Sequence, residues 1–218
     1  MIRLEVLANE EEIAGRAAEL ISAAAEEADA SRGVFAWAVS GGRTPLPVFR
    51  RLVLPWDRTV TWQVDERIAP VGHPDRNLTH ALDALSPEGA ATVRPMPVEA
   101  EDLEGAAAGY AADLPPMLDL VHLGIGDDGH TASLVPGDPV LDVRDRDVAV
   151  TGEYRGRRRM TLTYPALDRA REVLWIVAGA GKARPLQRLL AGDRSIPAGR
   201  VAAGHQIVLA DRPAATSG

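Results

Sequence analysis

The segment from Gly124 to Ser133 holds the side chains best suited to acid–base chemistry. It follows an apolar stretch that begins at Leu118, and it contains two aspartates, a histidine, a threonine and a serine among three glycines. A histidine ring has an ordinary pKa of about 6.5, so it accepts and returns a proton near neutral pH. Asp128 stands two residues before His130, where its carboxylate could fix the ring tautomer and stabilise the imidazolium. We predict that His130 is an acid–base group with Asp128 as its partner, although a lone loop histidine is more often structural.

The spacing of the three glycines in this segment matches the G-x-G-x-x-G loop of dinucleotide-binding proteins. Asp127 and Asp128 would stand where the pyrophosphate should lie, and their charge would repel it. A metal site built from Asp127, Asp128 and His130 is also disfavoured, because Mg²⁺ or Ca²⁺ needs more oxygen ligands and no second histidine is nearby in the sequence. We therefore expect neither a dinucleotide nor a metal ion here.

A second polar loop covers residues 40–45 and joins an expected strand to an expected helix. Its two adjacent glycines allow backbone N–H groups to approach a ligand closely. The helix that follows offers free N–H groups and the positive end of its dipole to an anion. An equally good interpretation is an ordinary turn in which Thr44 caps the helix and Pro45 is its first residue. The candidate phosphate-binding residues in this loop are Ser40, Gly41, Gly42, Arg43 and Thr44.

Charged residues stand at the ends of other expected elements. Asp65, Glu66 and Arg67 follow a strand, which would bring them to the same sheet edge, although such a triplet is more commonly a solvated turn. The arginines at 157–159 precede another strand, and Lys182 begins a helix. We expect most of these arginines to be solvated and one of them to contact a ligand. The remaining histidines, which we interpret as structural or surface residues, are His73, His80, His122 and His205.

Strands alternate with helices along most of the chain, which predicts a mainly parallel sheet covered on both faces. Ligands bind such sheets at the carboxyl ends of the strands, where the polar segments above would meet. Two further strands, at 148–151 and 160–164, are expected to run antiparallel to each other, and residues 213–218 to be frayed. No linker divides the chain, so we expect a single domain over residues 1–218. The other expected strands cover 2–7, 33–39, 60–64, 92–96, 118–123, 173–178 and 206–209, and the helices 9–30, 45–52, 77–85, 103–114 and 182–191.

The composition excludes several classes of protein. The 218 residues include no cysteine, which removes disulfides and thiolate chemistry, and 46% of them are hydrophobic, which is enough for a substantial core. The net charge of −7 argues against a nucleic-acid surface. No apolar run approaches the roughly 20 residues of a membrane span, and the first residues lack a signal-peptide pattern. We expect a cytoplasmic protein that binds neither nucleic acid nor membrane.

Three segments resemble, in the same order, the motifs of the 6-phosphogluconolactonase family. They are Ser40–Pro45, Asp65–Arg67 and Gly126–Gly137, and Arg159–Thr163 and Gly181–Lys182 resemble later landmarks of that family. The resemblance implies a three-layer α/β/α fold with a modified Rossmann-like sheet, shared with glucosamine-6-phosphate deaminases and ribose-5-phosphate isomerases. It also implies hydrolysis of 6-phospho-D-glucono-1,5-lactone in the oxidative pentose phosphate pathway, without a cofactor.

Carried over by position, the resemblance makes His130 the catalytic base and the Gly41–Gly42 loop, Arg67 and Lys182 the substrate-binding groups. Asp128 would orient His130, Asp65 would assist, and Arg159 is a further candidate for the phosphate. The chain departs from the family's pattern in three places: Arg43 replaces a small residue, Arg76 replaces the serine of a Ser-Asn pair, and Val135 replaces a phenylalanine.

Two alternatives stay open at this point. One is a sugar-phosphate isomerase or deaminase of the same fold, although the deaminases carry an acidic residue where this chain has Leu134-Val135-Pro136. The other is a non-catalytic sugar-phosphate sensor, which would bind its ligand without turnover. The sequence leaves the oligomeric state open between a monomer and a weak dimer.

Overall fold

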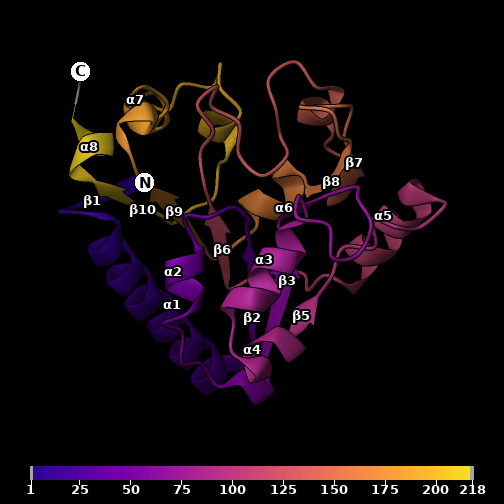
Figure 1. Cartoon of the computed structure of the whole chain (residues 1–218), viewed down its shortest axis with the longest axis horizontal. Helices are drawn as coiled ribbons and strands as arrows, with labels where there is room; N and C mark the ends of the chain where they lie inside the picture. Colours follow the sequence, from indigo (N-terminus) through magenta and orange to yellow (C-terminus); the bar gives the residue numbers. More distant parts are fainter. Residues whose placement is uncertain (1, 217–218) are drawn as a thin grey trace.

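A parallel sheet of seven strands runs through the computed structural model, which describes residues 2–216 (Figure 1). The strand order is β1-β10-β9-β6-β2-β3-β5, and every neighbouring pair is parallel. The mainly parallel sheet predicted from the sequence is therefore confirmed. Its strands are β1 (Ile2–Leu7), β2 (Phe35–Val39), β3 (Thr59–Gln63), β5 (Val93–Arg94), β6 (Leu120–Leu123), β9 (Glu172–Val177) and β10 (Gln206–Asp211).

Helices cover both faces of this sheet, as its apolar strands require. In β2 the large side chains Phe35, Trp37 and Val39 pack on the face with α1, α2 and α3, while Ala36 and Ala38 face the opposite core with α5, α6 and α7. Side chains of a strand alternate between faces, so a strand buried on both sides is apolar throughout. The helices are α1 (Glu10–Arg32), α2 (Leu46–Phe49), α3 (Asn77–Ala84), α4 (Pro87–Ala91), α5 (Leu103–Asp113), α6 (Tyr164–Asp168), α7 (Ala183–Leu190) and α8 (Arg212–Ala215), with 3₁₀ turns η1 (Trp56–Arg58), η2 (Pro139–Asp142), η3 (Ala180–Lys182) and η4 (Ala198–Arg200).

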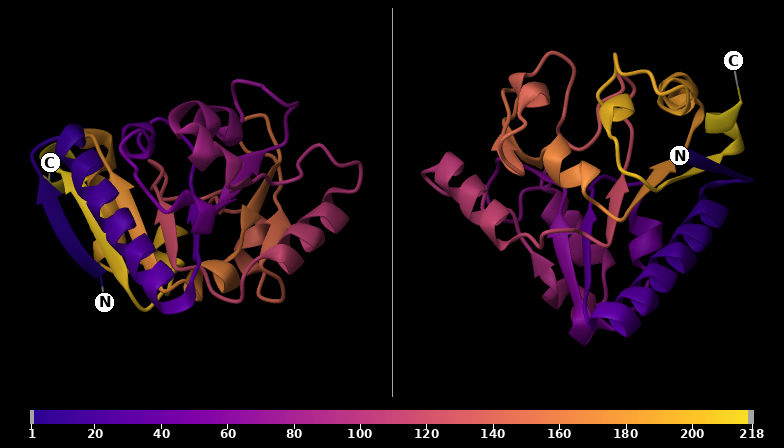
Figure 2. Two further views of the ribbon diagram at one scale, coloured as in Figure 1. Left: turned by 90° about the horizontal axis from the view of Figure 1, so that it is seen from below. Right: turned by 180° about the vertical axis from the view of Figure 1, so that it is seen from behind.

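Helix α1 begins and ends where its capping residues dictate. The side chain of Asn9 accepts a hydrogen bond from the N–H of Glu12, which makes Asn9 the N-cap. Gly33 ends the helix in the left-handed region, with φ 74°, a conformation that costs glycine little. Because Gly33 serves the helix, β2 starts at Phe35 rather than at Gly33 as the sequence suggested. Figure 2 shows α1 lying across one face of the sheet beside β1 and β10.

A second, antiparallel sheet lies on the α5 side and has the order β4-β8-β7. The predicted antiparallel pair is confirmed as β7 (Val148–Val150) and β8 (Arg159–Leu162). The charged triplet, for which a solvated turn was the more common interpretation, forms strand β4 (Asp65–Arg67), in which Asp65 pairs with Thr161. The main chain thus passes directly from the large sheet at β3 into the small one.

Two other expectations about local structure are wrong. The helix expected to reach Leu52 is the single turn α2, and its N-cap is Pro45 rather than Thr44, with no side-chain hydrogen bond. Four residues carry little macrodipole, so the helix contributes less to anion binding than the sequence suggested. The end expected to be frayed forms α8, whose first turn is capped by Asp211, while residues 217 and 218 lie outside the described part.

The carboxyl ends of β2, β6 and β9 are neighbours in the sheet and lead into residues 40–45, 124–133 and 178–182. This confirms that the parallel topology brings the separate polar segments to one edge. None of the helices within residues 2–216 combines the length and the apolar character that a bilayer crossing needs.

His122 on β6 makes the stability of this fold depend on pH. Its ring is buried, lies edge-on to Phe49 with ring centroids 6.3 Å apart, and burial lowers its pKa to about 4 from 6.5. As the pH falls below 6.5 the unfolded chain takes up a proton that the folded chain excludes, so stability declines until about pH 4 and then levels off. Between pH 7 and pH 5 this linkage should lower the free energy of unfolding by about 2 kcal/mol.

Denaturant unfolding tests this prediction with two variants. In His122→Gln the loss of unfolding free energy over that interval should be smaller by this amount, whereas His205→Gln, at an exposed position, should keep the wild-type loss. Equal losses in all three proteins would contradict the assignment.

Candidate active site

A pocket of about 440 Å³ opens at the carboxyl edge of the large sheet. Its walls come from the loops after β2, β6 and β9 and from the small sheet. His130 and Asp65 line this pocket, and Asp128 lies behind His130. The candidate phosphate-binding residues that line it are Ser40, Gly41, Gly42, Arg43, Thr44, Arg67, Arg159 and Lys182. The fold thus brings together residues as distant in the sequence as Ser40 and Lys182, which are 142 positions apart.

His130 and Asp128 form a hydrogen-bonded pair in the wall. The ring Nδ1 of His130 lies 2.6 Å from Asp128 Oδ1, which also accepts the backbone N–H of His130. An ionised carboxylate only accepts, so Nδ1 carries the proton and Nε2 is left as the basic nitrogen. Burial raises the pKa of Asp128, but the hydrogen bonds from His130 and from the Tyr154 hydroxyl outweigh it and leave that pKa below 3.8. Asp128 therefore stays ionised wherever His130 is neutral.

Gly126 leaves room for the imidazole ring of His130. A Cβ at this position would lie 2.0 Å from His130 Nδ1 and 2.2 Å from Cε1. The backbone N–H of Gly126 also donates to the His130 carbonyl at 2.8 Å, which closes the loop between these two residues. The close approach of the His130 ring therefore requires a glycine at this position.

Tyr154 supports the pair from the β7–β8 hairpin. Its hydroxyl donates to Asp128 Oδ2 at 3.0 Å, and its ring stands 5.6 Å from the His130 ring, edge to face. The guanidinium of Arg159 lies 4.9 Å from the Tyr154 centroid and that of Arg155 lies 5.1 Å from it. These cation–π contacts connect the hairpin cations to the acid–base pair.

Asp65 occupies the opposite part of the wall and contacts other partners. Its carboxylate accepts from Ser133 Oγ at 2.5 Å and from Asn77 Nδ2 at 3.1 Å, rather than from His130. Asn77 Nδ2 also donates to the Asp65 carbonyl, so the amide orientation is fixed because both partners only accept. The buried Asn77 Oδ1 is left without a hydrogen-bond partner among residues 2–216, and it lies against Gly41, where a Cβ would come within 2.0 Å of it.

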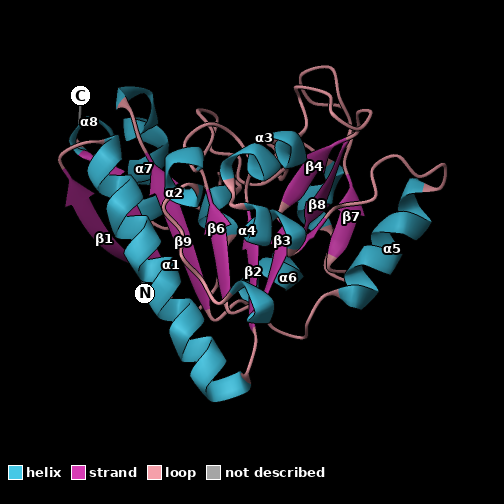
Figure 3. Cartoon of the chain, turned by 60° about the horizontal axis from the view of Figure 1, so that its bottom comes forward, coloured by secondary structure: helices cyan, strands magenta, loops and turns pink. Residues whose placement is uncertain are grey.

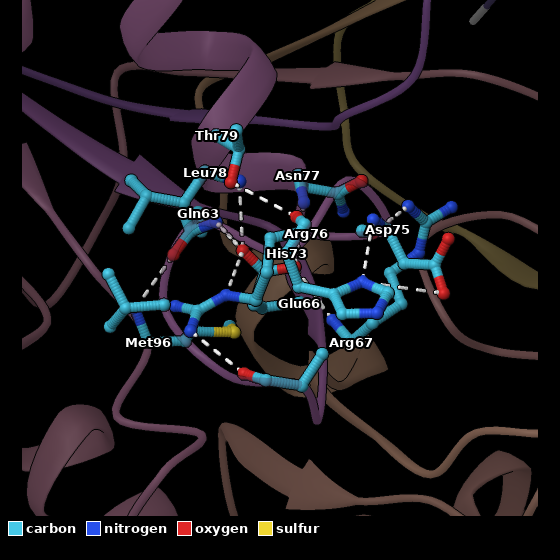
Figure 4. Close-up of polar contacts among 12 residues, drawn as sticks. Gln63, Glu66, Arg67, His73, Asp75, Arg76, Asn77, Leu78, Thr79 and Met96 are labelled. Carbon is cyan, nitrogen blue, oxygen red and sulfur yellow. Dashed lines mark hydrogen bonds and ion pairs between the residues drawn. The ribbon is translucent and has the colours of Figure 1, made fainter.

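Glu66 anchors this wall from the interior (Figure 4). Its carboxylate, fully buried, accepts from the N–H groups of Asn77 and Leu78 at 2.8 Å each and from Gln63 Nε2 at 3.0 Å. Those two N–H groups begin α3, whose N-cap residue Arg76 supplies no side-chain cap. The Glu66 carboxylate on β4 thus caps the N-terminus of α3, where the helix dipole favours a negative charge.

Arg76 completes this cluster by balancing the buried charge. Its Nε lies 3.2 Å from Glu66 Oε2, and Nη1 donates to the Ala69 carbonyl at 3.1 Å. Both side chains of the pair are almost wholly buried, with exposures of 3% and 0%. The departure at Arg76 noted in the sequence is therefore a structural ion pair, and Arg76 does not line the pocket.

Besides Arg43 in the loop after β2, four further cations line the pocket from other parts of the chain. Lys182 pairs with Asp127, and this interaction lowers the Asp127 pKa. Arg67 donates from Nη1 to the Asp75 carbonyl at 2.7 Å, and Arg159 is buried, which lowers its pKa although the charge of Asp65 acts in the opposite direction. Arg155 lines the pocket at the tip of the β7–β8 hairpin, where its φ is 53°. Of the arginines 157–159, Arg159 alone lines the pocket, as the sequence suggested for one of them.

No sequence motif pointed to Arg155, to Tyr154 or to the place of Asn77 in the pocket wall. Arg155 and Gly156 both have positive φ, the signature of a two-residue hairpin turn between strands, and a Gly after an arginine in a predicted hairpin was the only local signal. His122, expected to be structural, is buried on β6 and also lines the pocket.

The family of glucosamine-6-phosphate isomerases/6-phosphogluconolactonases has a sequence model that matches residues 8–210. The chain belongs to this family. A protein named 6-phosphogluconolactonase from Synechocystis sp. is 39% identical over 209 residues, which cover 88% of this chain and 86% of that protein. The resemblance predicted from the motifs is therefore confirmed.

Solved structures of the family have the same fold. That of 6-phosphogluconolactonase from Thermotoga maritima superposes with a TM-score of 0.86 at 26% identity and covers 97% of this chain and 99% of that chain. A monomeric glucosamine-6-phosphate deaminase superposes with a TM-score of 0.81 at 20% identity, with 98% of each chain covered, and shows the shared fold alone. The modified Rossmann-like arrangement predicted from the sequence is confirmed.

In this family member, Gly126→Ala should disable the site without unfolding the protein. The new methyl would collide with the His130 ring and turn Nε2 away from its position, so we expect kcat to fall by roughly 10²-fold or more. Gly109→Ala adds a methyl on α5, away from the pocket and with no atom within 4 Å, and should leave kcat unchanged. Steady-state kinetics and circular dichroism of both variants provide the test. A Gly126→Ala enzyme as active as Gly109→Ala would show that the ring position is not needed.

Removal of Arg76 should cost far more stability than removal of an exposed arginine. Arg76→Ala leaves the buried Glu66 charge without its counter-ion, which should lower the free energy of unfolding by about 3–5 kcal/mol. Arg58, half exposed and 3.4 Å from Asp29, is the control, and Arg58→Ala should cost less than about 1 kcal/mol. Guanidinium unfolding curves measure both. Equal losses would mean that the buried pair contributes no more than a surface pair.

Proposed function

We propose that this chain hydrolyses 6-phospho-D-glucono-1,5-lactone to 6-phospho-D-gluconate. The observation that carries the proposal is the His130–Asp128 pair, whose free Nε2 belongs to a side chain that lines a pocket also lined by Arg67, Arg155, Arg159 and Lys182. A general base beside a cluster of cations suits a phosphorylated ester that water must attack. The family membership and the names of the relatives support the same activity.

The acid–base pair accounts for each proton in the reaction. Neutral His130 removes a proton from water through Nε2 as the water oxygen bonds to the lactone carbonyl carbon. The resulting imidazolium is stabilised by Asp128, which is already ionised. The tetrahedral intermediate then collapses with cleavage of the bond between the carbonyl carbon and the ring oxygen. His130 returns its proton to that oxygen, which becomes a hydroxyl group, and the carboxylic acid ionises in water.

The remaining pocket residues bind and orient the substrate in this proposal. Arg67, Arg159 and Lys182, with the loop Ser40–Thr44 that includes Arg43, hold the phosphate, and Arg155 adds a further positive charge. Asn77, which lines the pocket, supports the Gly41 backbone against which its side chain packs. Asp65 acts as a helper by holding Asn77 and Ser133 in place and by balancing the charge of Arg159. No step requires a cofactor.

We propose further that the reaction takes place in the cytoplasm and involves no nucleic acid. The net charge of −7 opposes contact with a phosphate backbone, whereas a local group of cations suits one phosphorylated metabolite.

The direct test is hydrolysis of freshly prepared 6-phosphogluconolactone, with spontaneous ring opening subtracted. The wild type should exceed background clearly, and His130→Ala should lower kcat by about 10²–10⁴-fold because the general base is lost. His80→Ala, at a histidine that bonds the Pro74 carbonyl away from the pocket, should keep the wild-type rate. Release of ammonia from glucosamine 6-phosphate would instead favour a deaminase. Tight binding of a sugar phosphate without turnover would favour a sensor. A normal rate for His130→Ala would remove this residue from the mechanism.

A further inference from the structure

The strand β1 leaves one edge of the large sheet open. Among residues 2–216, β1 pairs only with β10 and forms the margin of the sheet, and Figure 3 shows no described element beyond it. It presents six residues without a proline, and Leu4 and Val6 are 38% and 49% exposed. The other edge is blunted, because β5 has two residues and Pro95 follows it. A long edge strand with exposed apolar side chains is a template for another strand.

The sequence of β1 is complementary to itself when it is read in the opposite direction. Antiparallel pairing centred on Leu4 places Arg3 of each copy opposite Glu5 of the other, and Ile2 opposite Val6. Residues directly opposite one another have Cβ atoms about 4.5–5.5 Å apart, so both Arg–Glu pairs are within ion-pair reach. The apolar residues then meet on one face and the charged residues on the other.

Every neighbouring register is worse. A shift that centres the pair on Arg3 or on Glu5 places two like charges opposite each other, which is unfavourable. A shift by a single residue places charged side chains opposite apolar ones and turns the apolar face of one strand to the charged face of the other. The charges on β1 thus select one pairing with a second copy, and they do not protect the edge against it.

The surroundings of β1 leave space for such a partner. Arg3 and Glu5 lie on the face toward α1, where Glu5 also accepts from Arg16 at 2.8 Å. α1 packs over β10 and β9, the strands that follow β1 in the sheet order, so the outer edge of β1 extends past the helix (Figure 3). Leu4 and Val6 lie on the opposite face.

We propose that two copies of this chain associate by antiparallel pairing of their β1 strands, centred on Leu4. The pairing joins two seven-stranded sheets into one continuous sheet across a two-fold axis. The partner strand runs in the opposite direction, so the two pockets open at opposite edges, and each is complete within its own chain. Stable interfaces usually bury about 1,200–2,000 Å², more than one strand per copy supplies, so we expect a dimer that forms at roughly 10–100 µM chain.

Sedimentation velocity over a range of about 5 to 200 µM measures this association, and a charge reversal tests its register. Arg3→Glu places carboxylates opposite Glu5 of the other copy and should abolish the dimer. Arg94→Glu makes the same change of charge on the exposed residue of the other edge strand and should leave the dimer intact. A wild type that stays monomeric at the highest concentration, or equal behaviour of the two variants, would overturn the proposal.

Thiol bridging tests the register in a chain that has no cysteine of its own. In Leu4→Cys the two thiols would face each other across the axis, and dibromobimane should bridge them rapidly. Val6→Cys, on the same face, would place its thiols four residues apart along the strands, about 13 Å, which the reagent cannot span. A mixture of Ile2→Cys and Val6→Cys should bridge only between different chains. Bridging of Val6→Cys alone as fast as Leu4→Cys would show that the chains meet in another way.

Discussion

The buried carboxylate of Glu66 is the interaction on which the geometry of the pocket depends. It lies on β4, where the chain leaves the large sheet for the small one, and it binds the first N–H groups of α3. A fully buried carboxylate without partners would be expensive, so its hydrogen bonds and the ion pair with Arg76 must form together. The consequence reaches the pocket through Asn77, which is held at the start of α3 and in turn holds Asp65 and lies against Gly41.

The acid–base pair is built on a different principle, because its main contact is local. Asp128 and His130 are two residues apart in one loop, and Gly126 leaves room for the ring. Distant segments then adjust the pair: the β7–β8 hairpin supplies Tyr154 to the second carboxylate oxygen of Asp128. The site therefore combines a base that is fixed locally with cations that only the tertiary fold assembles. One of these cations, Lys182, forms an ion pair with Asp127, which belongs to the same loop as Asp128 and His130.

This division explains what could be predicted from the sequence. His130 and its partner Asp128, the glycine loop at 40–45 and the edge where they meet follow from local spacing and from the topology of parallel strands. The strand formed by Asp65–Arg67 was not predictable, because three charged residues carry no strand signal and their pairing partners on β8 are some ninety residues distant in sequence. The role of Arg76 was also out of reach, since a lone arginine before a helix reveals nothing about a buried carboxylate ten residues earlier.

The positions of the cations were only partly predictable for the same reason. Arg159 was one of three consecutive arginines, and its selection depends on the strand register that turns it inward while Arg157 pairs with Asp75. Arg155 reaches the pocket through a turn with positive φ, which places an arginine in a backbone conformation uncommon for that residue. In both cases the decisive information is the geometry of the hairpin.

The central claim is that Asp128 holds His130 with its basic nitrogen toward the pocket, and the tautomer of the ring tests it most directly. Histidine ring ¹⁵N shifts, measured by NMR at neutral pH and assigned by comparison with His130→Ala, distinguish a proton on Nδ1 from one on Nε2. The structure predicts that neutral His130 carries its proton on Nδ1, hydrogen-bonded to Asp128, and that this preference is lost in Asp128→Ala. A proton on Nε2 in the wild type would leave no base facing the substrate and would contradict the account.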